Sequence, residues 1–157
     1  MEAPADNLDI EEHAAVKPRG STSRPDKLIV DRLWALYEWP EWNLPMQKMT
    51  IQKLRRYRTQ PKYVCDVART RKQPALRWDY GRIRFFYERL LAGETLEPVD
   101  VDNRCDYGHI YAEPVLLDGH HRLAASHLAN APIILANYGG RVDLLRYLIG
   151  ARKTCPT

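Results

Sequence analysis

Cysteine is scarce in this chain of 157 residues, which contains only Cys65, Cys105 and Cys155. The three are odd in number, widely separated and without a Cys-x-x-Cys pair, which argues against a disulfide framework and a zinc knuckle. No apolar run approaches the roughly twenty residues of a membrane-spanning helix, and the acidic N-terminus lacks the apolar stretch of a secretory signal. The composition predicts a cytoplasmic protein with no membrane partner.

The net charge of the whole chain is only +4, but acids are nearly absent from one segment and basic residues are nearly absent from another. Residues 48–72 contain nine Lys and Arg side chains and one acid, whereas residues 94–118 contain seven acids and one Arg. The basic segment is a candidate nucleic-acid interface, or simply a solvated face. Its predicted nucleic-acid contacts are Lys53, Arg55, Arg56 and Arg58.

A chain of this length has room for one compact domain and a flexible tail. Residues 1–26 have few large apolar groups and are expected to form the tail. Residues 27–78 are expected to form a helical, basic extension, packed on a core formed by residues 79–157. The Trp-rich region 34–42 is predicted to be a side wall of the core, with an exposed surface for a protein partner or for bases as the alternative.

The spacing of apolar residues predicts an α/β (α+β) fold, a small mixed sheet flanked by helices, with a helical Trp-rich N-terminal extension. Helical spacing runs from Asp26 to the stop at Pro40, and further helices are predicted at 50–58, 79–92, 120–129 and 141–149. Strands are predicted at 63–68, 96–101, 110–117 and 132–138. Asp79 is expected to cap its helix, Pro114 to lie in an edge strand, and residues 103–108 to form a turn.

The turn with the most distinctive chemistry is Asp118-Gly119-His120-His121-Arg122, between a predicted strand and a predicted helix. The first turn of a helix presents unpaired amides and the positive end of its dipole, both of which favour an anion. A glycine lets a ligand approach the backbone closely, and an arginine can bind phosphate through two parallel hydrogen bonds. The turn is predicted to bind a nucleotide phosphate through Gly119, His120, His121 and Arg122.

The same turn supplies the catalytic candidates Asp118, His120 and His121. Asp118 could bind Mg²⁺ or act as a base, or it could merely cap the helix. Either histidine could be a general acid, but adjacent helical residues point about 100° apart, so both are not expected to serve one atom.

Other polar residues have ordinary structural alternatives. His127 is expected to be a hydrogen-bonded core histidine. The carboxylates of Glu97, Asp100 and Asp102 could lie near the turn or on a solvated strand face. The side chains of Tyr107 and His109 could stack on a base or belong to an ordinary turn.

The stretch Leu116–Ala125, LLDGHHRLAA, resembles the signature of the ParB/sulfiredoxin superfamily, and a helix and short strand are expected to follow it. The resemblance covers roughly residues 79–138 and implies an α/β fold in which this turn binds nucleotide phosphates. Sulfiredoxins have their nucleophilic Cys where this chain has His120, and partition proteins match only at Gly119 and Arg122. The Asp-Gly-His-x-Arg form is more similar to the nuclease-like and small-molecule kinase-like members.

The resemblance implies a nucleotide-binding protein that uses ATP, ADP or CTP with Mg²⁺ and hydrolyses the nucleotide or transfers its phosphoryl group. One alternative is a DNA-associated protein or nuclease, and therefore a hydrolase, that uses the same turn and residues 48–72. Another is a non-catalytic interaction module that docks through residues 34–42.

Overall fold

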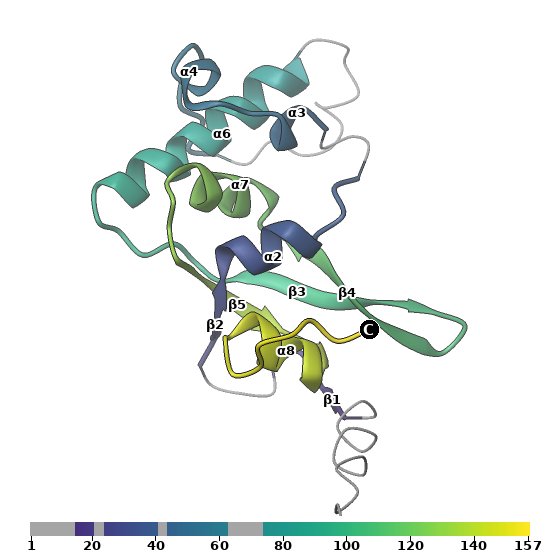
Figure 1. The fold of residues 1–157 in the computed structure, drawn as a ribbon. Helices are drawn as coiled ribbons and strands as arrows, with labels where there is room; N and C mark the ends of the chain where they lie inside the picture. The colour runs from purple at the N-terminus through teal and green to yellow at the C-terminus, as the bar shows by residue number, and fades with distance from the viewer. Residues whose placement is uncertain (1–14, 21–23, 41–43, 63–73) are drawn as a thin grey trace, which may run out of the picture.

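The computed structural model describes residues 15–20, 24–40, 44–62 and 74–157. Its mixed content of helices and strands confirms the predicted α+β class (Figure 1). No helix in these ranges is long and apolar enough to cross a membrane. The elements are β1 (Val16–Lys17), β2 (Asp26–Ile29), α2 (Val30–Leu36), α3 (Leu44–Gln47), α4 (Ile51–Leu54), α6 (Pro74–Leu91), β3 (Val99–Asp106), β4 (His109–Asp118), α7 (His120–Leu128), β5 (Ile133–Tyr138), β6 (Gly140–Arg141) and α8 (Val142–Leu148).

Four strands form a mixed sheet in the order β2-β5-β3-β4. β5 is antiparallel to β2 and parallel to β3, and β3 is antiparallel to β4. β4 is therefore an edge strand, which confirms the place expected for Pro114, a residue with no amide proton to donate. β1 and β6 pair separately as a short antiparallel ribbon.

The core lies between the sheet and the helices. Burial alternates along the strands, so that Val99 and Val101 of β3 are fully buried on the same face as Ala136 and Tyr138 of β5. The fully buried Leu123 of α7 belongs to the same cluster. In Figure 1, α7 lies between α6 and the sheet, so two helix layers cover this part of the sheet. This arrangement brings the first turn of α7 close to both β3 and α6.

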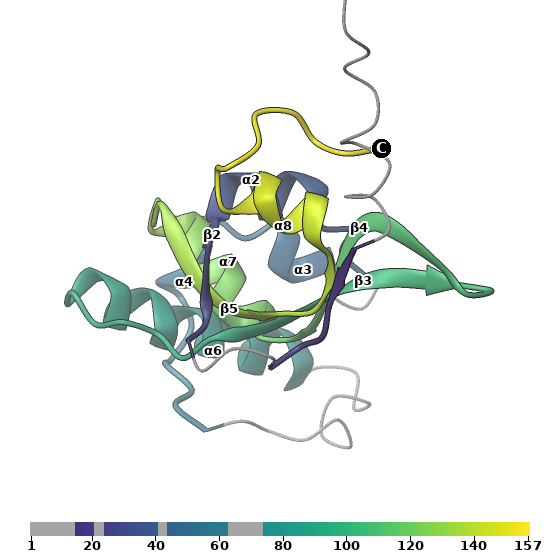
Figure 2. The same ribbon diagram turned by 90° about the horizontal axis from the view of Figure 1, so that it is seen from below.

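The β3–β4 hairpin extends beyond the rest of the molecule (Figure 2), and its turn is shorter than the sequence predicts. The expected turn at residues 103–108 is wrong, because residues 103–106 belong to β3, which pairs with β4, and only Tyr107 and Gly108 turn, with φ of 50° and 79°. Asn103 is buried within the strand because its side-chain oxygen accepts hydrogen bonds from the Tyr138 hydroxyl and the Arg141 amide.

Three other expectations need correction. Residues 26–29 are a strand, because they pair with the apolar strand β5 instead of continuing the helical spacing that follows. Residues 16–17 and 26 are paired too, so these parts of the predicted tail are structured. α6 begins at Pro74, which places Asp79 inside the helix and not at its cap. Residues 1–14 and the strand predicted at 63–68 lie outside the described residues.

Candidate functional site

The turn between β4 and α7 is built around Gly119. This residue has a left-handed conformation, with φ of 101° and ψ of 22°, and a Cβ added to it would lie 2.4 Å from Cγ1 of Val99. The turn therefore needs glycine both for its backbone conformation and for its contact with β3. Gly119 is the N-cap of α7 and provides no side-chain hydrogen bond, so the first-turn amides lack the cap that Ser or Asp would supply.

Arg122 links the turn to the segment that leads into β3. Its Nη1 donates to the carbonyls of Glu97 and Pro98 at 3.0 and 2.7 Å, and its Nη2 donates to the Asp118 carboxylate at 2.8 Å. The residue is only 8% exposed. These contacts give Arg122 a structural role, and phosphate binding by this residue would have to use its remaining donors.

The side chain of Asp118, unlike that of the buried Arg122, lies largely in solvent. Its side chain is 71% exposed, although one oxygen accepts the hydrogen bond from Arg122. It makes no capping hydrogen bond to α7, so the simple capping role is not observed. No group of three or more His, Cys, Asp or Glu side chains in the described ranges could hold a metal ion. Mg²⁺ at Asp118 would therefore depend on oxygen atoms from a ligand.

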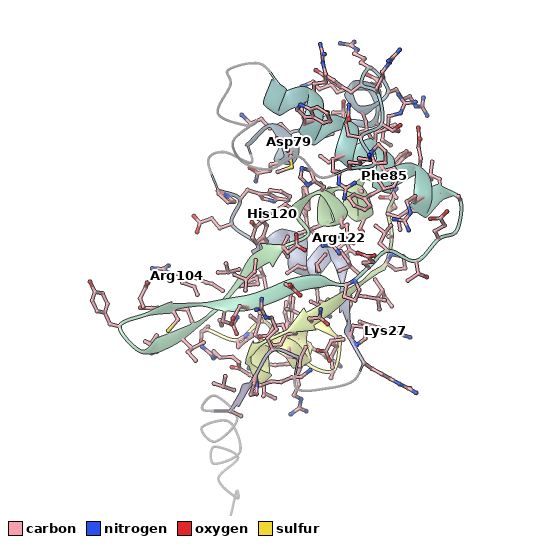
Figure 3. All side chains as sticks on the ribbon, turned by 180° about the vertical axis from the view of Figure 1, so that it is seen from behind. Lys27, Asp79, Phe85, Arg104, His120 and Arg122 are labelled. Atoms are coloured by element: carbon pink, nitrogen blue, oxygen red, sulfur yellow. The ribbon has the colours of Figure 1, made fainter. Side chains whose placement is uncertain are left out.

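The two neighbouring histidines diverge, as the helical geometry predicts. The His121 Nε2 lies 2.8 Å from Oδ1 of Asp79 in α6, and both side chains are nearly buried. The His120 ring instead lies 5.9 Å from the Tyr37 ring and 6.3 Å from the Trp39 ring. Figure 3 labels Asp79, His120 and Arg122 in this region. The sequence pattern assigned Asp79 to a helix cap and not to this site.

Charged groups of both signs surround the turn. The pKa of Arg82 in α6 is lowered by burial and then by the positive charge of Arg122, whereas Asp118 and Glu97 act to raise it. Arg82 therefore lies within electrostatic reach of two other arginines, Arg122 and Arg89, and of two carboxylates.

A groove beside the turn could hold the uncharged part of a ligand. It has a volume of about 560 Å³, in the range of small-molecule sites, and His120 is part of its wall. Leu36, Tyr37 and Pro40 line one side, and the edge strand β4 contributes residues 113–117. The groove thus combines apolar and aromatic walls with the charged residues Glu38, Arg104 and Glu113 and with the His120 ring.

The acidic strand residues are engaged in local contacts. Asp100 accepts a hydrogen bond from Asn137 at 3.0 Å, and Asp102 accepts one from the amide of Asn103 at 2.8 Å. Glu97 is exposed and contributes its backbone carbonyl to Arg122.

The hairpin aromatics lie at the turn of β3 and β4. Tyr107 is fully exposed, and the His109 ring lies 4.5 Å from the Tyr111 ring. The prediction that they stack on a base is untested.

The tryptophans confirm the prediction of a core side wall. Trp39 is 7% exposed, and Trp34 packs against the core with its ring stacked 3.9 Å from the His127 ring. The expectation of a hydrogen-bonded His127 is wrong, because its buried Nδ1 has no hydrogen-bond partner. Burial lowers the pKa of His127, and the charge of Asp31 opposes this shift only in part. Trp42 lies outside the described residues.

The predicted nucleic-acid contacts lie on and after α4, apart from the turn. Lys53, Arg55, Arg56 and Arg58 are all exposed. The helix predicted at 50–58 is shorter than expected, because α4 ends at Leu54; Thr50 is its N-cap, and Leu54 is buried as predicted.

The chain matches no family model, and neither a similar curated protein nor a similar solved structure was found. The resemblance of residues 116–125 to the ParB/sulfiredoxin signature therefore remains a prediction. The functional argument rests on the geometry of the turn and on the chemistry of its residues.

Proposed function

We propose that the protein binds a phosphate-bearing nucleotide at the first turn of α7, with Mg²⁺ held between the ligand and Asp118. The observation that supports this proposal is the N-terminus of α7, which follows a left-handed glycine and has no side-chain cap. Such a helix end attracts phosphate through its amides and its dipole. The groove next to His120 has room for the nucleoside part.

His121 is the side chain best prepared for chemistry. The 2.8 Å contact between His121 Nε2 and Asp79 Oδ1 fixes the ring, and in the tautomer that has its proton on Nε2 the Nδ1 atom is left for the ligand. The neutral ring can accept a proton at Nδ1, and the protonated ring can donate one to a phosphate oxygen. Hydrolysis or phosphoryl transfer at this turn would use His121 in one of these two states.

In this proposal Arg122 has a structural role, whereas the sequence predicts that it binds phosphate. It holds the β3 entry, the end of β4 and α7 together, and so keeps the amide groups in place. The exposed carboxylate of Asp118 supplies the oxygen ligand that Mg²⁺ prefers beside phosphate.

The test is a thermal-shift panel of ATP, ADP and CTP with and without Mg²⁺. A nucleotide at about ten times its Kd should stabilise the protein by about 1.4 kcal/mol, or roughly 3–6 °C in Tm. His121→Ala should reduce this shift, and His109→Ala, which removes an exposed histidine from the hairpin, should leave it intact. The absence of a shift with every nucleotide at millimolar concentration would contradict the proposal.

A further inference from the structure

Five exposed cationic side chains lie on α4 and the chain that follows it, and α4 is at one end of the molecule (Figure 1). We call this group the cationic corner. None of its members makes an ion pair with a carboxylate in the described part of the chain. It consists of Lys53, Arg55, Arg56, Arg58 and Lys62, all of which are exposed.

The backbone of the cationic corner is fixed to α6 by side-chain hydrogen bonds and by an aromatic contact. Arg84 of α6 donates through Nη1 to the carbonyls of Arg55 and Tyr57, at 3.2 and 2.7 Å. The Tyr57 ring packs edge-to-face on Tyr80, with the ring centroids 4.8 Å apart. These contacts hold the first half of the segment in one conformation.

The second half of the segment is held by Gly81 and Arg82. The amide of Gln60 donates to the Gly81 carbonyl at 3.0 Å, and Arg82 donates to the carbonyls of Gln60 and Pro61. A Cβ on Gly81 would lie 2.2 Å from the Arg58 carbonyl oxygen, so the close approach requires glycine inside this helix. A segment whose charges merely face solvent would not require these contacts with α6.

These contacts with α6 also separate the charges of the segment. Its carbonyl oxygens face the arginines of α6, whereas its own cationic side chains face solvent. The carboxylate of Glu88 is paired with Arg84 at 2.8 Å and does not pair with the cationic corner. Five positive charges on ten residues repel one another, and a ligand with closely spaced negative charges removes that repulsion.

We propose that the cationic corner binds the phosphate backbone of a nucleic acid. Three of the five side chains are arginines, which can contact phosphate oxygens through paired donors. Tyr57 faces Tyr80, so the described part of the cationic corner has no exposed aromatic ring to stack on a base. Binding through phosphates alone carries no sequence information, and the affinity depends little on sequence.

The proposal predicts how steeply the binding constant falls with salt concentration. If four phosphates are neutralised, the logarithm of the binding constant falls with the logarithm of the salt concentration at a slope of about −3.6. Affinity then decreases about 150-fold between roughly 50 and 200 mM salt. This proposal does not depend on nucleotide binding at α7, because the two sites use different side chains.

Fluorescence anisotropy with a labelled duplex and a labelled single strand, each in two unrelated sequences, tests the proposal. Arg55→Ala/Arg56→Ala should weaken binding at low salt at least tenfold and reduce the slope by about 1.8. Lys27→Ala/Lys153→Ala is the control, because it removes two exposed cations on β2 and after α8 (Figure 3 labels Lys27). The control should keep the slope of the wild type.

Three results would overturn the proposal. The first is no binding of either nucleic acid at about 50 mM salt. The second is an equal loss in both double variants, which would attribute binding to net charge alone. The third is salt-dependent self-association in sedimentation experiments that Arg55→Ala/Arg56→Ala abolishes without nucleic-acid binding, because the cationic corner would then serve the acidic residues of a second copy.

Discussion

Replacing Arg122 is expected to destabilise the fold before it affects any ligand. The side chain makes three hydrogen bonds, to two carbonyls and one carboxylate, while it is only 8% exposed. Arg122→Ala leaves the carbonyls of Glu97 and Pro98 without their donor, at a cost of about 1–3 kcal/mol for each one that stays buried. Asp118 is exposed and loses little. We expect Arg122→Ala to lower the free energy of unfolding by about 2–4 kcal/mol.

Urea denaturation followed by circular dichroism measures this loss. Arg122→Lys keeps the charge but cannot reach two carbonyls and a carboxylate at once, so it should recover less than half of the lost stability. Asp118→Asn is the matched control, since it removes the charge of the exposed partner and keeps the buried carbonyl contacts. It should stay within about 0.5 kcal/mol of the wild type.

The result that would refute this reasoning is an Arg122→Ala protein as stable as the wild type. In that case the hydrogen bonds of Arg122 would contribute nothing, and its guanidinium would be free to serve a ligand. A destabilised variant has a practical consequence, because loss of nucleotide binding in Arg122→Ala would then report a damaged turn. For this reason the ligand test above uses His121, and the nucleotide shift is measured from the Tm of each variant without ligand, because His121→Ala also removes the partner of the buried Asp79.

Three further substitutions test packing and protonation. Gly81→Ala should destabilise by about 1–3 kcal/mol in urea, despite the better helix propensity of Ala, because the Cβ would overlap the Arg58 carbonyl; equal or higher stability would contradict the packing argument. The pKa of His127 is lowered on folding, so the unfolded state binds more protons and stability falls with acidification below pH 6.5. His127→Phe should lose less Tm than the wild type between about pH 7.5 and about pH 5, and an identical loss would exclude His127 as a cause. Tyr138→Phe removes a buried hydroxyl that lies within hydrogen-bond distance of the Asn103 side-chain oxygen and the Arg141 carbonyl, and it should cost about 1 kcal/mol in thermal denaturation; no loss would show that these contacts are neutral.

The sequence was most informative where structure is local. The strand, the glycine turn and the helix at 109–128 follow from alternation, a residue tolerant of positive φ and helical spacing, all within twenty residues. The sequence also predicted that Pro114 lies in an edge strand, because an edge strand tolerates a residue without an amide proton. These rules act through neighbouring residues, so one sequence is enough to apply them.

The remaining features depend on contacts between distant residues. Asp79 and His121 lie 42 positions apart, and nothing in either segment indicates that their helices meet. The apolar residues Leu28 and Ile29 fit helical spacing, but pairing with β5 makes them a strand. The resemblance and the basic run indicated the candidate residues, whereas the roles of Arg122 and of Gly81 became visible only through packing.

The two proposed sites share α6, which leads to one more prediction. Arg82 donates hydrogen bonds to the backbone of the cationic corner, and it also interacts electrostatically with Arg122 and Asp118. Two unit charges about 10 Å apart in water interact by about 0.4 kcal/mol, so a multiply charged nucleotide at α7 should weaken nucleic-acid binding a few-fold at low salt. By linkage, nucleic acid should weaken nucleotide binding by the same factor. The coupling should weaken as salt rises to about 200 mM, roughly where the Debye length falls below 8 Å. Coupling that persists unchanged at high salt would mean that the two ligands compete for the same side chains.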